Sequence, residues 1–305
     1  MNNKEKYCGI IPAFFACYDK KGVVDGKRVE TFAKHLKNKG VKGLYVGGSS
    51  GECIYQTINE RMQTLEHVMN AVGGELTVIA HVACNSTSES RMLATHAESL
   101  GVDAIAAIPP VYFHLPEYAI AEYWNDISNA APNSDFIIYN IPQLAGTALT
   151  KSLLEEMLKN PRLIGVKNSS APTQDIQLFK AVGGDDFIIF NGPDEQLVSG
   201  LVIGADGAIG GTYAIMPELY LKLKEMVDCG NIELAKKIQF AVNEIIYKIC
   251  TCHGNIYSIE KEILRLRENI DIGDVHKPLP QFISADIPII NACVDMINNA
   301  VKNLL

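Results

Sequence analysis

Lys167 is the residue whose position in this sequence points most directly to chemistry. It ends the apolar run 163–167 (LIGVK), so an ammonium group stands where a buried strand should end. Lysine is rarely fully buried without a partner or a function. Burial disfavours the cation of a group whose pKa is ordinarily ~10.4 and so increases the fraction of free amine. Such an amine can attack a carbonyl group, although a salt bridge at the rim or an anion site would explain the lysine equally well.

Two further motifs place polar groups after apolar runs. The segment 47–52 (GGSSGE) offers exposed backbone amides and two hydroxyls that could hold a small anion. It lacks the lysine of a P-loop and the spacing of a dinucleotide fingerprint, and a flexible turn is the alternative interpretation. Tyr139 ends the apolar run 136–139 and presents a phenol, for which a place in the core or at an interface is the alternative.

Other kinds of site find no support in the sequence. The seven histidines show no HExxH arrangement, and the segment 250–253 (CTCH) lacks the ligand spacing of a zinc site, so we expect helical residues there and no metal. Ser49 does not stand in a GxSxG nucleophile elbow. The eight cysteines have no framework spacing, and most lie in apolar stretches where a thiol acts as a small hydrophobe, so a reducing cytoplasm is expected.

Composition excludes several classes of protein. The 305 residues include 27 basic and 35 acidic side chains, a net charge of −8, and no basic block, so a nucleic-acid partner is not expected. The longest stretch without a charged residue, 136–150, is shorter than the ~20 apolar residues of a membrane span, so no membrane association is expected either. A small-molecule substrate is the default.

Short apolar runs alternate with amphipathic helical patterns along the chain. Near-continuous apolar character is what strands buried on both faces of a parallel sheet require. The predicted strands are 9–14, 43–46, 76–82, 104–108, 136–140, 163–167, 187–191 and 207–210. Eight βα units of this length close a (β/α)₈ TIM barrel, whose active site lies at the carboxyl ends of the strands. A doubly wound open sheet would normally have fewer units and a glycine turn after its first strand.

The intervening segments carry helix signals. Thr57 and Glu60, like Ser86 and Glu89, have the spacing of a capping box at a helix start. Residues from Gly230 onward look helical and lie beyond the eighth unit. We therefore expect a barrel over 1–229 and a C-terminal helical extension over 230–305, packed on the barrel as a single structural unit.

The order and spacing of three motifs resemble a known family. GGSSGE after the second strand, YNIP after the fifth and GVK after the sixth are similar to the pyruvate-dependent class I aldolases of the dihydrodipicolinate synthase and N-acetylneuraminate lyase superfamily. The similarity covers about 8–270. It implies a TIM barrel with a C-terminal helical extension, usually a homotetramer, and reversible aldol cleavage without a metal or organic cofactor.

The resemblance assigns a role to each matching residue. Lys167 would form a Schiff base with pyruvate, Tyr139 would move protons, and Tyr112 would reach toward a neighbouring subunit's site. The residues implied to bind the pyruvate carboxylate and the sugar chain are Gly48, Ser49, Ser50, Ser169, Gly192, Asp194, Glu195 and Gly211.

Two positions bear on the substrate. Dihydrodipicolinate synthases have an arginine, two residues after the proline of YNxP, that holds the carboxylate of their aldehyde. Leu144 stands there, which implies an uncharged aldehyde and favours cleavage of N-acetylneuraminate to N-acetylmannosamine and pyruvate. The lyases have a serine where this chain has Gly211. The alternatives are another aldolase or dehydratase of 2-keto-3-deoxy sugar acids, a dihydrodipicolinate synthase, or a non-catalytic sensor of pyruvate or sialate.

Overall fold

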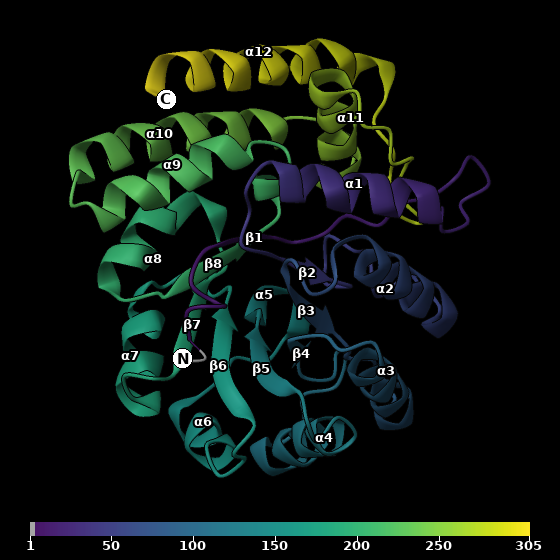
Figure 1. Cartoon of the computed structure of the whole chain (residues 1–305), viewed down its shortest axis with the longest axis vertical. Coiled ribbons are helices and arrows are strands. Elements are labelled where there is room, and N and C mark those ends of the chain that lie inside the picture. The colour runs from purple at the N-terminus through teal and green to yellow at the C-terminus, as the bar shows by residue number, and fades with distance from the viewer. Residues whose placement is uncertain (1–3) are drawn as a thin grey trace.

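A computed structural model describes residues 4–305, and its eight strands form one parallel barrel with helices around it (Figure 1). The hydrogen-bonded order is β1-β8-β7-β6-β5-β4-β3-β2, and a parallel bridge between Ala13 and Tyr45 joins the two ends of the sheet. The strands are β1 (Ile10–Pro12), β2 (Gly43–Val46), β3 (Thr77–His81), β4 (Ala104–Ala107), β5 (Asp135–Asn140), β6 (Leu163–Asn168), β7 (Ile188–Asn191) and β8 (Gly207–Gly210). The predicted (β/α)₈ barrel is confirmed.

Twelve α-helices are assigned within residues 4–305. They are α1 (Gly26–Asn38), α2 (Ile58–Val72), α3 (Thr87–Ser99), α4 (Glu117–Asn129), α5 (Pro142–Ala145), α6 (Lys151–Met157), α7 (Gln174–Gly183), α8 (Leu197–Ile203), α9 (Pro217–Asp228), α10 (Ile232–Ile249), α11 (Ile256–Glu268) and α12 (Ile287–Leu304). The helix α2 begins with the predicted capping box between Thr57 and Glu60. At α3 only half of the predicted capping box forms: Ser86 accepts a hydrogen bond from the amide of Glu89, and no reciprocal bond from the Glu89 side chain is present within the described residues.

The core has two layers because each strand is covered on both faces. Every residue of β2, β3, β4 and β7 is buried, as their unbroken apolar runs require. One layer lies between strands and helices, and the other fills the barrel interior. The interior layer consists of Tyr7, Ile11, Ala13, Tyr45, Ile79, Ala104, Ala106, Ile137, Tyr139, Ile188, Phe190 and Ile209. The described barrel interior is therefore a packed core and not a pore.

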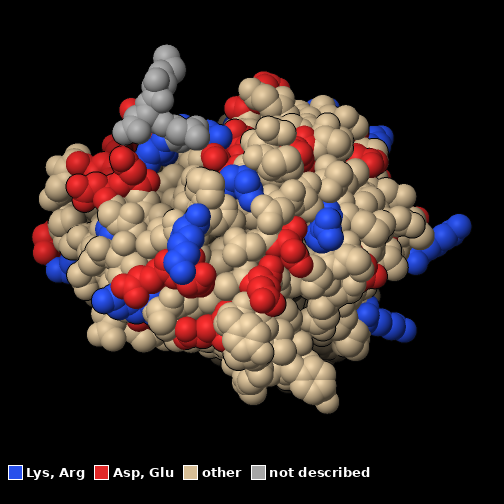
Figure 2. Space-filling view, turned by 90° about the horizontal axis from the view of Figure 1, so that it is seen from below, with Lys and Arg blue, Asp and Glu red and all other residues tan. Residues whose placement is uncertain are grey.

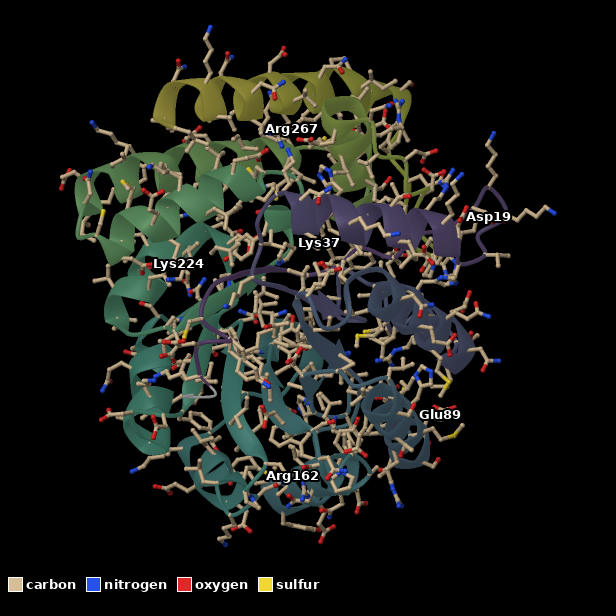
Figure 3. All side chains as sticks on the ribbon, in the orientation of Figure 1. Asp19, Lys37, Glu89, Arg162, Lys224 and Arg267 are labelled. Carbon is tan, nitrogen blue, oxygen red and sulfur yellow. The ribbon has the colours of Figure 1, made fainter. Side chains whose placement is uncertain are left out.

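The helices α10, α11 and α12 follow the eighth unit and lie side by side with α9 at one side of the barrel (Figure 1). Arg267 on α11 joins this group to the barrel helices (Figure 3): its guanidinium donates to the Ile215 carbonyl at 2.9 Å and pairs with Glu218 at 3.0 Å. Lys39, just after α1, pairs with both Glu218 and Glu268. This ion network fixes α11 relative to α1 and α9.

One local expectation is wrong. The segment 250–253 is a turn between α10 and α11, not helix, because α10 ends at Ile249 and the chain reverses toward Asn255. Asp286 accepts hydrogen bonds from the amides of His253 and Gly254 and so holds this turn. All eight cysteines are free thiols, in agreement with the absence of a disulfide framework.

The surface is of mixed charge. On the face shown in Figure 2, acidic and basic side chains are interspersed and leave broad areas with neither. None of the helices in residues 4–305 has the length and hydropathy needed to span a bilayer.

Candidate active site

Lys167 lies in β6, at the mouth of the barrel, and is only 4% exposed. Its Nζ stands 3.9 Å from the ring centroid of Tyr139 and 4.3 Å from that of Tyr45. It lines a cavity of about 620 Å³ formed by the loops at the carboxyl ends of the strands. Within the described residues that line this cavity, Lys167 is the only lysine or arginine. The ammonium therefore rests on ring faces, which attract a cation.

Tyr139 comes from β5 and pairs in register with Lys167, so both side chains point to the barrel interior. The Tyr139 ring meets those of Tyr45 and His81 edge to face, at centroid distances of 5.7 and 5.9 Å. Burial raises the pKa of the Tyr45 phenol well above its usual range, and within the described chain the Tyr45 hydroxyl has no hydrogen-bond partner. The lysine amine thus contacts two phenol rings that also contact each other, and of these Tyr139 lines the cavity.

The glycine-rich turn 47–52 is held by His81 of β3. The Nδ1 of His81 donates to the Gly47 carbonyl at 2.8 Å, and burial, reinforced by Arg61, keeps the pKa of this imidazole well below its usual value. Ser49 and Ser50 face the cavity. Gly48 is buried and is not among the residues that line the cavity, and a Cβ there would lie 2.7 Å from the Tyr45 ring. The structure therefore gives Gly48 a packing role.

Three consecutive strands end in an asparagine, which on two of them follows Tyr139 or Lys167, a pattern that our sequence analysis missed. Asn140, Asn168 and Asn191 share one register level, and the Nδ2 of Asn140 donates to the Oδ1 of Asn168 at 2.7 Å. The side-chain amide of Asn191 donates to the Pro193 carbonyl at 2.7 Å. Because neighbouring residues of a strand point to opposite faces, these amides brace the loops from outside while Tyr139 faces inward. The repeated Asn at strand ends was visible in the sequence.

The opposite wall of the cavity carries the predicted sugar-binding residues. Ser169, Gly192, Asp194, Glu195 and Gly211 all line it, as the resemblance implied. At Gly192, a Cβ would lie 2.7 Å from the Asn168 carbonyl oxygen and 2.8 Å from the Ser169 Cα, so only glycine allows these two loops to meet. Gly211 has an ordinary φ of −74°, and a Cβ there would meet only the Ser50 hydroxyl, at 3.3 Å. The missing serine leaves open space.

Asp194 is buried at the start of a short 3-10 helix (Asp194–Gln196). Its Oδ2 accepts from the amide and the hydroxyl of Thr212 at 2.8 and 2.6 Å, while its Oδ1 has no partner among the described residues. Burial raises the pKa of Asp194 to about 7, against the hydrogen bonds from Thr212, which lower it. At neutral pH this carboxyl can therefore both donate and accept a hydrogen bond.

Two cavity residues from α11 were also missed by the sequence analysis. Tyr257 and Glu260 lie three positions apart and so share one face of the helix, and both line the cavity. No sequence motif indicates that Tyr257 and Glu260 belong to a site, because the only pattern around them is the apolar spacing of an ordinary core helix.

Tyr112 is not brought to this cavity. It is 87% exposed on the loop between β4 and α4, with a left-handed φ of 87°. Its ring contacts that of Phe113, which is itself exposed, at 4.9 Å. A bulky side chain at positive φ is strained and needs an external reason.

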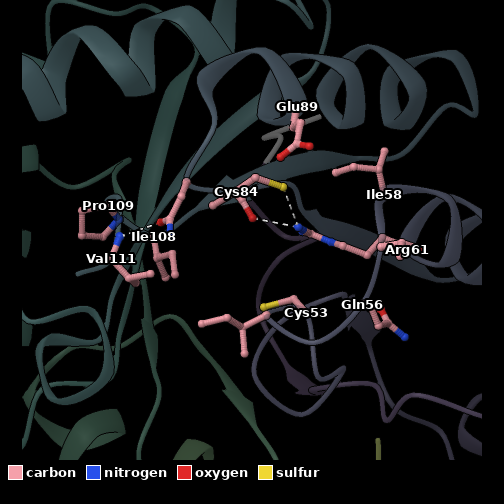
Figure 4. Close-up of a pocket in the computed structure, with 13 residues that line it drawn as sticks. Cys53, Gln56, Ile58, Arg61, Cys84, Glu89, Ile108, Pro109 and Val111 are labelled. Carbon is pink, nitrogen blue, oxygen red and sulfur yellow. Dashed lines mark hydrogen bonds between the residues drawn. The ribbon is translucent and has the colours of Figure 1, made fainter. Parts of the chain in front are cut away.

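A second cavity, of about 250 Å³, lies beside α2 and α3 and contains Cys53, Cys84 and Arg61 (Figure 4). The Arg61 guanidinium donates to the Ala83 carbonyl at 2.8 Å and contacts the Cys84 sulfur at 3.1 Å. Burial raises the pKa of both thiols, which makes them poor nucleophiles. No group of three or more potential metal ligands occurs in the part of the chain described.

A (β/α)₈ barrel with an amine and a phenol at the carboxyl ends of its strands is typical of a class of barrel enzymes. Comparison with known proteins shows to which family within that class this chain belongs. The model of the dihydrodipicolinate synthetase family matches residues 6–281. The N-acetylneuraminate lyase of Mediterraneibacter gnavus is 61% identical, over 100% of this chain and 97% of that protein. The N-acetylneuraminate lyase of Escherichia coli is 33% identical, over 78% of this chain and 80% of that protein.

Solved structures agree. The wild-type sialic acid aldolase of Ruminococcus gnavus is 61% identical, with a TM-score of 0.97 over 98% of this chain and 100% of that one. A catalytic lysine mutant of the same aldolase gives a TM-score of 0.99 over 100% of both chains. This chain belongs to the dihydrodipicolinate synthetase family. Within the family it falls into the N-acetylneuraminate lyase subgroup, as the three motifs predicted.

Proposed function

We propose that this protein is a Schiff-base aldolase that reversibly cleaves N-acetylneuraminate to N-acetylmannosamine and pyruvate. The observation that carries the proposal is Lys167, a buried amine at the mouth of a barrel, beside a phenol and in a cavity large enough for a sugar acid. The 61% identical sialic acid aldolase, which has a catalytic lysine, supports the same assignment.

The chemical steps follow from these two groups. The Lys167 amine attacks the keto carbon C2 of the open-chain substrate, and loss of water gives a protonated imine. The Tyr139 phenol then relays a proton as the C3–C4 bond breaks: it accepts the proton of the C4 hydroxyl and passes its own to the substrate carboxylate, while the bonding electrons flow into the imine to leave a neutral enamine. The aldehyde departs, the enamine is protonated at C3, and hydrolysis releases pyruvate and the free amine. Because the imine accepts the electrons, this step needs no metal or organic cofactor.

The remaining contacts divide between the two halves of the substrate. Ser49 and Ser50 are proposed to hold the carboxylate next to C2, since both line the same cavity as Lys167. Ser169, Gly192, Asp194 and Glu195 are proposed to bind the hydroxyl-rich chain beyond C4. Since α11 contributes to the cavity, the barrel over 1–229 and the extension over 230–305 act as one unit in this proposal.

Tyr112 enters the proposal through self-association. It lies in an exposed apolar patch with Phe113, Leu115 and Tyr118, the kind of surface that a partner subunit covers. We propose a homotetramer in which this loop approaches a neighbour's site, working in the cytoplasm, for which the eight unpaired thiols are suited.

Trapping of the imine tests the proposed function. Borohydride in the presence of pyruvate should inactivate the enzyme irreversibly and add the reduced pyruvyl mass to Lys167, whereas Lys167→Arg should be neither labelled nor active. Pyruvate release from N-acetylneuraminate should persist in EDTA. Label on another lysine, or an active enzyme that is never labelled, would falsify the Schiff-base assignment.

A further inference from the structure

Glu260 is a buried acid in the cavity wall that no step described so far uses. It lies on α11, is 1% exposed, and lines the cavity together with Tyr257. Its Oε2 is buried and has no hydrogen-bond partner among residues 4–305. A buried polar atom without a partner costs about 1–3 kcal/mol, so such an atom in a cavity wall needs a reason outside the free protein.

The surroundings of Glu260 do not pair it with a cation. The next residue, Lys261, donates instead to Glu52 at 2.7 Å and to the Asp274 carbonyl at 2.8 Å. The described lining of the cavity contains Lys167 as its only lysine or arginine, whereas three carboxyl groups lie there, those of Asp194, Glu195 and Glu260. Glu260 is therefore not half of an ion pair with any described residue.

The protonation of Glu260 suits a neutral, hydroxyl-bearing ligand. Burial raises the pKa of this carboxyl well above its usual range, and the charges of Asp194 and Glu195 raise it further. A neutral carboxyl has one O–H donor and an acceptor oxygen, the same combination that a sugar hydroxyl or an acetamido group can satisfy.

The helix holds Glu260 in place. Glu52, at the end of the glycine-rich turn, accepts from Lys261 and from the amide of His276 at 2.7 Å each, and both members of the Glu52–Lys261 pair are buried. This pair ties α11 to the turn that faces Lys167. A side chain on such a helix is positioned before substrate arrives, which reduces the entropy lost on binding.

We infer that Glu260 is a further substrate-binding residue, which hydrogen-bonds a hydroxyl or acetamido group of the sugar half of the substrate. This contact comes from α11. Gly211, which lines the same cavity, has no side chain to supply one. The inference rests on the proposed function, since it needs a sugar half to bind. According to this inference, the sugar half of the substrate is bound both by the loops that follow β7 and β8 and by α11.

The test is the condensation of pyruvate with N-acetylmannosamine, because this reaction reports on the two halves separately. Glu260→Leu should raise the KM for N-acetylmannosamine about two- to tenfold, the worth of one hydrogen bond. The KM for pyruvate and the rate of pyruvate-dependent borohydride labelling should stay within about twofold of wild type. Glu260→Gln keeps a hydrogen-bond donor and an acceptor, so its KM values for N-acetylmannosamine and for pyruvate should both stay close to wild type.

Two controls separate binding from structure. Glu262→Leu removes an acid of the same helix that pairs with Arg265 and lies outside the cavity, and it should change neither KM. The thermal midpoint of ligand-free Glu260→Leu should rise, because an unpartnered buried carboxyl disappears, whereas loss of a structural residue would lower it. If the leucine variant does not fold, Glu260→Ala takes its place in both measurements.

The outcomes are distinct. A rise in the KM for N-acetylmannosamine alone supports the inference. Unchanged constants in Glu260→Leu, or equal rises in both KM values with a lower thermal midpoint, overturn it and leave the proposed function intact. A wild-type enzyme that cannot join these two compounds overturns the proposed function and this inference with it.

Discussion

The two ends of the cavity differ in how their polar groups are satisfied. Around Lys167, the lysine is packed against two rings, and His81 holds the glycine-rich turn through a neutral imidazole. Around Asp194, oxygens of two carboxyls, Asp194 Oδ1 and Glu260 Oε2, have no partner in the described part of the chain. The reaction end leaves the neutral Tyr45 hydroxyl without a described partner, whereas the sugar end leaves the oxygens of two carboxyl groups without one.

This difference fits the task of each end. Imine chemistry needs one geometry whatever sugar is attached, so the groups there are fixed by packing within the barrel. Recognition of a chain of hydroxyls needs open donors and acceptors, and these cost stability until a ligand satisfies them. Changes at the reaction end should therefore affect rate, and changes at the sugar end should affect specificity, pH dependence and stability.

The largest effect is expected at the reaction end. Tyr139→Phe should lower kcat by about 10²–10⁴-fold, because it removes the group that accepts the C4 proton. Tyr45→Phe is the matched control, since the Tyr45 ring also covers Lys167 but its hydroxyl is bonded to no described residue, and its kcat should change little. Steady-state kinetics with pyruvate detection measures both. Equal losses in the two variants would mean that the phenols act only through packing.

The second largest effect is expected at the sugar end, as a change in how the free energy of unfolding depends on pH. The pKa of Asp194 is about 7 in the folded protein and 3.8 in the ordinary carboxyl, so the folded state keeps a proton that the unfolded state releases. Stability contributed by this group is therefore present below pH 4 and is lost as pH rises through about 7. The loss of unfolding free energy between pH 4 and pH 7 is on the order of 4 kcal/mol, and Asp194→Asn should abolish it.

Denaturant unfolding at several pH values measures that difference. Glu195→Gln removes a neighbouring exposed charge that contributes to the raised pKa of Asp194, so it should reduce the pH-dependent loss only in part. A constant difference in unfolding free energy between wild type and Asp194→Asn from pH 4 to pH 7 would show that the Asp194 carboxyl is ionised throughout.

Specificity for the aldehyde should shift by a smaller factor. Leu144 lines the cavity and is 64% exposed, so there is room for a longer side chain. Leu144→Arg should raise kcat/KM for pyruvate with aspartate semialdehyde by about 10- to 100-fold, the worth of a charge-assisted hydrogen bond to its carboxylate. Leu144→Met is the control without charge. Wild-type protein that uses aspartate semialdehyde as well as N-acetylmannosamine would refute the proposed substrate.

Gly211→Ser should have the smallest effect. The φ of Gly211 does not require glycine, and the Ser50 hydroxyl, which would lie 3.3 Å from the new Cβ, can rotate away. A serine there could make one more hydrogen bond to the sugar chain, so kcat/KM for N-acetylneuraminate should improve about two- to tenfold. Gly211→Ala supplies the same bulk without the hydroxyl. If the native enzyme prefers 2-keto-3-deoxygluconate and serine brings no gain on sialate, the alternative of a shorter sugar acid is favoured.

Much of the reaction end could be predicted from short stretches of sequence. An apolar run that ends in Lys167 or Tyr139 specifies a buried strand and, through the geometry of parallel sheets, the mouth at which both residues meet. The Asn that ends each of three strands could have been predicted in the same way. The segment 250–253 shows the limit of such prediction, since it lies between two helical patterns and its own residues did not indicate a turn.

What the sequence alone determined is the set of groups carried at strand ends, because burial on both faces imposes apolar runs and any polar interruption stands out. Only the tertiary structure decided the rest. Glu260 reaches the cavity because α11, whose Lys261 pairs with Glu52 more than two hundred positions away, packs against the barrel mouth. Tyr112 is kept out because its loop points to solvent. Contacts between residues so far apart depend on packing and charge pairing across the fold, and no local spacing encodes them.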